Sequence, residues 1–145
     1  MQLKVFNGSP RLVANNTDIL LKKFLAGFGE TSGNASEVIR LNKLNDLAKA
    51  IEIFKQSEAV LIAFPLYVYS LPAGLMQFVQ ALEPLRGACK GKPLGFLVQF
   101  GFREAVHARP LEKYLEKLAT DLNCTYLGTI IKGGCDGLVK YPDAH

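Results

Sequence analysis

The first polar loop of the chain, residues 7–17, carries the side chains with the clearest potential for chemistry. Ser9, Asn16 and Thr17 are hydrogen-bond donors, and Arg11 adds a positive charge just before a segment with helical spacing. Free N–H groups at a helix N-terminus attract anions, and the helix dipole strengthens this attraction. The loop is therefore interpreted as a phosphate site. The alternative is that Asn16 or Thr17 only caps the helix, and both roles can hold together.

Two common nucleotide motifs are missing from this loop. It contains no GxGxxG, which a dinucleotide site of the Rossmann type would carry, and no Gly-Lys-Ser/Thr, which an ATPase or GTPase P-loop would carry. The segment after the first apolar run also lacks the acidic pair expected of a response-regulator receiver. These absences narrow the interpretation to the phosphate of a mononucleotide.

A second loop, residues 65–71, brings two aromatic side chains close to a strand end. Tyr67 and Tyr69 follow the apolar run 59–64 directly. Aromatic rings at such a position can stack on a flat ring such as a flavin. The alternative is that these tyrosines are ordinary surface or interface residues.

A third loop, residues 101–107, follows another apolar run. Gly101 allows the backbone to approach a ligand closely. Arg103, Glu104 and His107 are suited to hydrogen-bond the polar edge of a ring or a nicotinamide donor. The alternative for His107 is a cap or surface position near a helix start. No nucleophile, base and orienting group occur together in the sequence, so covalent hydrolysis is not supported.

Apolar runs alternate with segments of helical spacing, which predicts βαβ units and a parallel sheet. The predicted strands are 3–6, 37–41, 59–64, 93–100 and 126–131. Ligands of such sheets bind at the carboxyl ends of the strands. The loops that matter are therefore 7–17, 65–71, 101–107 and 132–141.

Helices are predicted between these strands from apolar residues three and four positions apart. Leu21, Phe24, Leu25 and Phe28 mark the first helix, which Gly27 and Gly29 are expected to end. A short helix is predicted over 45–55, and Pro72 and Pro110 are well placed to open two more. The face of the last one is expected to contain Leu111, Tyr114, Leu115, Leu118 and Leu122.

The end of the chain departs from this alternation. A glycine-rich segment follows the fifth strand, and the sequence stops at His145. Pro142 and Asp143 are typical of a helix start, where a fifth helix would cover the sheet. We expect one domain over 1–145, either truncated before its C-terminal helix or burying this face against a second copy.

Composition places limits on the class of protein. The 145 residues are 49% hydrophobic, and no apolar run reaches the ~18 to 20 residues of a membrane span. We expect a cytoplasmic protein with no membrane partner. The net charge of +4 is spread out, with a loose concentration at Arg86, Lys90, Lys92, Arg103 and Arg109, so nucleic acid is not an expected partner. A small electron carrier for basic partners would be acidic.

The three cysteines, Cys89, Cys124 and Cys135, match no CxxC or zinc spacing. An odd number without a signal peptide argues for reduced thiols. Structural thiols are the favoured interpretation over a redox role.

Together the three loops resemble the NAD(P)H-dependent FMN reductase and flavodoxin-like oxidoreductase families. The resemblance rests on Gly8-Ser9-Pro10-Arg11 with Asn16-Thr17, on the stretch 64–75, and on 101–107, and it covers essentially the whole chain. It implies an α/β flavodoxin-like three-layer sandwich with a five-stranded parallel sheet of order 2-1-3-4-5, its last helix missing here.

The resemblance also implies roles by position. The residues expected to bind the FMN phosphate are Ser9, Arg11, Asn16 and Thr17. Those expected along the ribityl chain and ring edge are Pro65, Leu66, Tyr67 and Val68. Those expected to border the isoalloxazine are Gly101, Phe102, Arg103, Glu104 and His107. No catalytic acid or base is required, because the flavin performs the redox chemistry. Relatives commonly form homodimers with the flavin near the interface.

The implied activity passes a hydride from NADH or NADPH through FMN to a quinone, a flavin or another small acceptor. The segment 41–47 is short and free of cysteine, unlike the cysteine-bearing insert of many relatives, which excludes the iron–sulfur ligand set and leaves no expected metal. Two alternatives stay open: a one-electron carrier of the flavodoxin type, and a non-catalytic binding module that has lost its flavin.

Overall fold

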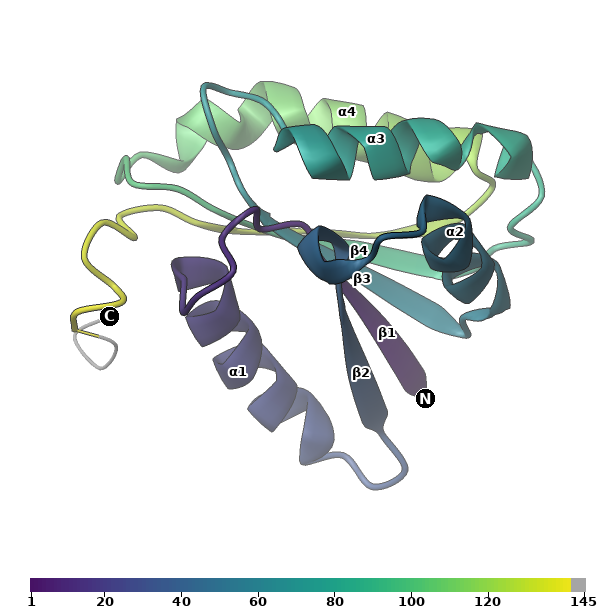
Figure 1. The fold of residues 1–145 in the computed structure, drawn as a ribbon, viewed down its shortest axis with the longest axis horizontal. Helices are drawn as coiled ribbons and strands as arrows, with labels where there is room; N and C mark the ends of the chain where they lie inside the picture. Colours follow the sequence, from purple (N-terminus) through teal and green to yellow (C-terminus); the bar gives the residue numbers. More distant parts are fainter. Residues whose placement is uncertain (142–145) are drawn as a thin grey trace.

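Five parallel strands form a single sheet, in the order β2-β1-β3-β4-β5. The computed structural model describes residues 1–141 (Figure 1). The strands are β1 (Gln2–Asn7), β2 (Ala35–Arg40), β3 (Ala59–Pro65), β4 (Pro93–Gln99) and β5 (Thr125–Lys132). This arrangement confirms the flavodoxin-like sheet order that the resemblance implied.

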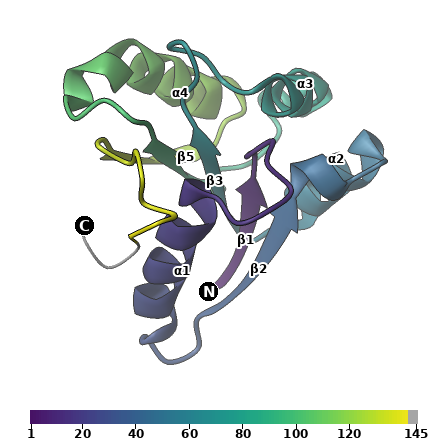
Figure 2. The same cartoon turned by 60° about the vertical axis from the view of Figure 1, so that its left-hand side comes forward.

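Helices cover both faces of the sheet. They are α1 (Asn16–Gly29), α2 (Leu47–Gln56), α3 (Ala73–Ala81) and α4 (Arg109–Asp121), with short 3-10 turns η1 (Leu41–Lys43), η2 (Glu83–Leu85) and η3 (Ala105–Ala108). The helices α2, α3 and α4 lie on one face and α1 lies on the other, as the two views show (Figures 1 and 2). No helix within residues 1–141 is long and apolar enough to cross a membrane.

The register of the sheet brings the three predicted loops together. Asn7 at the end of β1 pairs with Ala63, and Pro65 at the end of β3 pairs with Gln99 of β4. The central strand β3 is buried at every position, as expected for a parallel strand covered on both faces. Because neighbouring strands end at matching heights, the loops after β1, β3 and β4 open at one edge of the sheet.

The larger part of the core lies between the sheet and the helices α2, α3 and α4. Its centre is a cluster of phenylalanines, in which the rings of Phe6 and Phe78 stack with centroids 4.9 Å apart and Phe54 packs beside both. All three side chains are fully buried. Full burial of a phenylalanine stabilises the fold by roughly 1.5–3 kcal/mol, so this cluster fixes α2 and α3 against β1 of the sheet.

The opposite face is covered more sparsely. Leu21 of α1 is buried, while Phe24, Leu25 and Phe28 are only half-buried. Within residues 1–141, α1 is the only helix on this face, and on β5 the side chains of Leu127 and Ile130 remain 63% and 47% exposed. The helix start expected at 142–143 lies outside the described residues.

Two helical predictions were wrong in detail. Gly27 lies inside α1, which continues to Gly29, so the first of the two glycines does not end the helix. Tyr114 is 44% exposed, because the buried stripe of α4 runs through Leu111, Leu115 and Ala119 and leaves Tyr114 on its flank.

Candidate functional site

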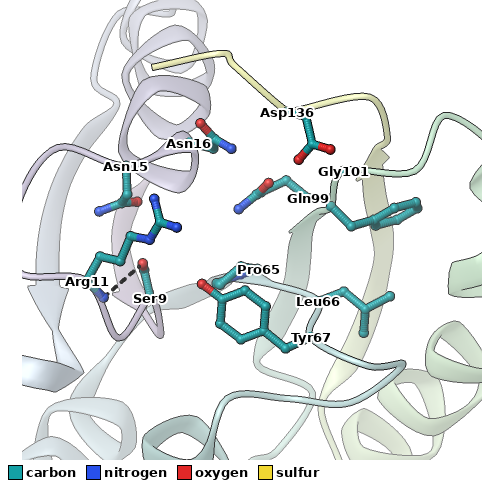
Figure 3. Close-up of a pocket in the computed structure, with 11 residues that line it drawn as sticks. Ser9, Arg11, Asn15, Asn16, Pro65, Leu66, Tyr67, Gln99, Gly101 and Asp136 are labelled. Atoms are coloured by element: carbon teal, nitrogen blue, oxygen red, sulfur yellow. Dashed lines mark hydrogen bonds between the residues drawn. The ribbon is translucent and has the colours of Figure 1, made fainter. Parts of the chain in front are cut away.

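A cavity of about 220 Å³ opens at the carboxyl edge of the sheet, between the loops that follow β1, β3 and β4 (Figure 3). Its lining combines polar groups from the first loop with backbone and apolar groups from the other two. The lining residues are Ser9, Arg11, Asn15, Asn16, Pro65, Leu66, Tyr67, Gln99, Phe100, Gly101 and Asp136. Seven of the thirteen predicted site residues are among them.

The first loop is held in place by side chains on each side of it. The N–H of Ser9 donates to Oδ1 of Asn7 at 2.9 Å, and the N–H of Arg11 donates to Oγ of Ser9 at 3.4 Å. From η1, the side-chain amide of Asn42 donates to the carbonyls of Ser9 and Arg11 at 3.0 and 2.9 Å. The hydroxyl proton of Ser9 stays free to donate into the cavity, whereas its N–H does not.

The helix cap is Asn15, so the alternative that Asn16 or Thr17 only caps α1 does not hold. Oδ1 of Asn15 accepts from the N–H of Asp18 at 3.1 Å, the usual geometry for a capping side chain. The cap leaves the N–H groups of Asn16 and Thr17 without a hydrogen-bond partner among the described residues. The N–H of Asn16 therefore remains available at the edge of the cavity, whereas Thr17 is fully buried.

Asp18 ties this helix start to the sheet. Its carboxylate accepts from the side-chain amides of Asn7 and Asn15, both at 2.8 Å. It also forms an ion pair with Arg40 at 2.7 Å. Because Asn7 ends β1 and Arg40 ends β2, this network fixes the direction in which α1 presents its N-terminus.

Asn16 and Thr17 have structural partners that the sequence did not reveal. The side-chain amide of Asn16 lines the cavity and donates to the carbonyl of Cys135 at 2.8 Å. Thr17 is fully buried, and its hydroxyl oxygen lies 3.4 Å from Nε2 of Gln99. The Thr17 side chain therefore does not reach the cavity.

The second loop contributes Pro65, Leu66 and Tyr67 to the lining, and then turns sharply. Tyr67 and Ser70 exchange two backbone hydrogen bonds, of 3.1 and 2.8 Å, around Val68 and Tyr69. Both central residues have positive φ, 46° and 61°, a conformation that is rare for a β-branched valine. The Val68 side chain is 92% exposed and does not line the cavity.

The third loop divides its residues between the cavity and a neighbouring apolar hollow. Gly101 lines the cavity, while Phe102 and His107 line the hollow together with Val68 and Tyr69. Within the hollow, the Tyr69 hydroxyl lies 3.3 Å from Nδ1 of His107. The hollow and the cavity share Leu66 and Phe100, so the two spaces adjoin.

Arg103 and Glu104 line neither space. The Glu104 carboxylate lies 3.9 Å from Nε2 of His107 and is largely exposed. Of the residues predicted on the third loop, only Gly101 is therefore brought to the cavity itself.

Asp136 is a lining residue that the predicted site residues did not include. Its segment packs along the third loop, where the N–H of Gly134 donates to the carbonyl of Phe102 at 2.7 Å and the N–H of Cys135 to that of Phe100 at 3.0 Å. The Asp136 carboxylate lies directly on Gly101, with no room for a Cβ there. The only sequence signal was that 132–141 is a loop at a strand's carboxyl end.

The charged groups lie on opposite sides of the cavity. Figure 3 shows Arg11 with Ser9 and Asn15 on one side, and Asp136 with Gly101 and Gln99 on the other. Burial raises the pKa of the neighbouring Cys135 thiol above its ordinary value, so this sulfur is a neutral core group. No cluster of three or more metal-binding side chains occurs within residues 1–141.

Comparison with known proteins gives structural likenesses. An NADPH-quinone reductase from P. pentosaceus is 22% identical, with a TM-score of 0.67 over 92% of this chain and 86% of that one. General stress protein 14 from Treponema denticola, in complex with FMN, is 16% identical with a TM-score of 0.68, over 96% and 89% of the two chains. An FMN-dependent NADH-azoreductase from Bacillus anthracis, also in complex with FMN, is 15% identical with a TM-score of 0.70, over 92% and 88%.

At these identities the likeness establishes the fold, which is flavodoxin-like. No protein-family model matches the sequence, and no curated protein matches it.

Proposed function

We propose that this chain is an FMN-dependent oxidoreductase of the NAD(P)H-dependent FMN reductase family. The observation that carries the proposal is the pairing of a polar cavity at the N-terminus of α1 with an adjoining apolar hollow. A phosphate on a polar chain would fit the polar cavity. The edge of a flat ring would fit the apolar hollow. The solved structures of the same fold include two proteins in complex with FMN.

The phosphate would lie on the Arg11 side of the cavity. The Ser9 hydroxyl, the Arg11 guanidinium and the free N–H of Asn16 would hold it, since these three residues line the cavity. Hydrogen bonds to a charged group contribute roughly 1.5–3 kcal/mol each, so a few of them account for tight binding of a phosphate. The Asp136 carboxylate is on the far side, where ribityl hydroxyls would donate to it.

The flavin ring would extend over Leu66 and Phe100 toward the hollow. Pro65 and Tyr67 would line its path, while Val68, Phe102 and His107 would border its edge. Thr17 is fully buried, so it would support the start of α1 rather than contact the phosphate. Arg103 and Glu104 lie outside both spaces and would contact only a second substrate.

Bound FMN would accept a hydride from NADH or NADPH and pass electrons to a small acceptor such as a quinone, a flavin or an azo compound. The chain's own groups bind the flavin, orient it and shield one side of it from water. Two solved structures of the same fold carry the names quinone reductase and azoreductase. The net charge of +4 disfavours a flavodoxin-type carrier that docks on basic partners.

Titration of the full chain with FMN, followed by anaerobic addition of NADH or NADPH, tests the proposal. We expect saturable binding that shifts the flavin absorption band, and bleaching of that band by at least one nucleotide. Binding without bleaching would support an electron carrier, and no binding would reject the flavoprotein. Arg11→Gln should weaken FMN binding at least about tenfold, whereas Lys49→Gln, which removes an exposed charge on α2, should leave binding unchanged.

We also propose that the protein is a cytoplasmic homodimer. Large apolar side chains are exposed beside the cavity, with Val68 at 92% and Phe102 and Val106 at 64% each. A second copy packed there would cover them. Light scattering after size exclusion, with and without FMN, gives the mass that decides this point.

A further inference from the structure

Two of the three cysteines lie side by side at the edge of the sheet opposite the cavity. Cys89 is in the turn before β4, and Cys124 is in the turn before β5. Backbone hydrogen bonds join the two turns: Cys89 N–H donates to the Leu122 carbonyl at 3.0 Å, and Gly91 N–H donates to the Asn123 carbonyl at 2.7 Å. The relative position of the two cysteines is thus fixed by the backbone.

The pairing of the two turns puts both thiols in the same part of the core. Burial, reinforced by the charge and hydrogen bonding of the Cys89 thiol, raises the pKa of Cys124 to about 12. Both side chains are half-buried against the same core cluster, and both are free thiols. Two free thiols on turns that are hydrogen-bonded to each other, packed against one core cluster, are the starting arrangement for an intramolecular disulfide.

A cation and an opening complete the cluster. The Lys92 ammonium lies near both thiols and donates to the carbonyls of Phe54 and Lys55 at the end of α2, at 2.6 and 2.9 Å. Cys89 and Lys92 also line a cavity of about 330 Å³, whose lining does not include Cys124. Cys89 is therefore the sulfur that a small oxidant entering this cavity would meet.

We propose that Cys89 and Cys124 are a redox modification site, which a hydroperoxide converts reversibly into an intramolecular disulfide. The Cys89 thiolate attacks one peroxide oxygen and breaks the O–O bond, giving a sulfenic acid; with hydrogen peroxide the other oxygen leaves as water. The Cys124 sulfur then attacks the Cys89 sulfur, and a second water leaves. In total, two thiols and one hydrogen peroxide give one disulfide and two waters.

The proposal does not rest on the FMN site, because the pair lies at the other end of the strands. It also leaves Cys135 out, since that thiol is only 1% exposed and packs beside the cavity. In a reducing compartment, disulfides are transient and usually sense or transfer oxidising equivalents, which fits a pair that is reduced at rest.

Peptide mapping after exposure of the full chain to hydrogen peroxide tests the proposal. The remaining thiols are blocked, and the chain is digested with trypsin without reduction. We expect peptide 87–90 to be linked to peptide 118–132, peptide 133–140 to carry the blocking group, and the free thiols to fall from three to one. Dithiothreitol should restore all three.

Cysteine variants test whether the linkage is specific to Cys89 and Cys124 or reflects general thiol oxidation. Cys89→Ser and Cys124→Ser should each abolish the linked peptide, while the matched Cys135→Ser variant should keep it. Having two single variants guards against the failure of one to fold. Cys89 carried to sulfinic or sulfonic acid without linkage, a linkage to Cys135, or a covalent dimer would each overturn the proposal.

Discussion

The side-chain amide of Asn16 donates a 2.8 Å hydrogen bond to the carbonyl of Cys135, joining residues 119 positions apart. Asn16 begins the first helix, and Cys135 lies in the segment that follows the last strand. This bond closes one side of the cavity, because the next residue, Asp136, lines it. Asn16, which was expected to bind phosphate, thus also positions the segment that brings Asp136 to the cavity.

Asn16→Ala should loosen the segment 133–138. We expect faster amide exchange at Gly134 and Cys135, whose N–H groups are bonded to the third loop, and a loss of about 1 kcal/mol of stability for one hydrogen bond. Asn34→Ala is a matched control, since it removes a similar bond from an asparagine amide to the Phe28 carbonyl. Exchange at Gly134 that is equally fast in both variants would contradict the role of Asn16.

Gly101→Ala should displace the Asp136 carboxylate, which occupies the space of a Cβ. Because Asp136 is exposed and can rotate, we expect a cost of only about 1 kcal/mol, at the low end for overpacking. Asp136→Ala in the same chain should remove this cost, as urea unfolding of the two single variants and the double variant would measure. Gly27→Ala, where no atom lies within 4 Å of the new Cβ, serves as control. Additive effects would show that the two residues do not interact.

Val68→Asn should stabilise the protein by about 1 kcal/mol. Val68 has a φ of 46°, which costs a valine roughly 1–2 kcal/mol and an asparagine less. Its side chain is 92% exposed, so little packing is lost. Val13→Asn replaces another exposed valine, one whose φ is not positive, and should give no such gain in thermal unfolding. Equal shifts for both variants would mean that the turn at Val68 is not strained.

Stability should fall at alkaline pH through Cys124. Its pKa rises from 9.0 to about 12 on folding, so above pH 9 the unfolded chain loses a proton that the folded chain keeps. Stability from this group is therefore complete below pH 9 and is lost as pH rises toward 12. Under reducing conditions, wild type should lose stability with pH more steeply than Cys124→Ala in urea unfolding. Parallel curves for the two proteins would contradict this assignment.

The sequence by itself determined the order of the elements and the edge of the sheet that holds the site. Continuous apolar runs such as 59–64 specify buried parallel strands, and the loops that follow such strands must meet at one edge. This reasoning located Ser9, Arg11 and Gly101 at the cavity. It rests on local patterns, which a single sequence displays directly.

Only the tertiary structure decided which side chains face the cavity and which instead make hydrogen bonds that hold the fold together. Thr17 turns inward to Gln99, Asn15 takes the cap, and Asp136 enters from the far end of the chain. Likewise, Cys89 and Cys124 are 35 residues apart in sequence and become neighbours through the pairing of two turns. The physical reason is that these contacts join segments far apart in the sequence. They depend on how the whole chain packs, which no local pattern of residue types encodes.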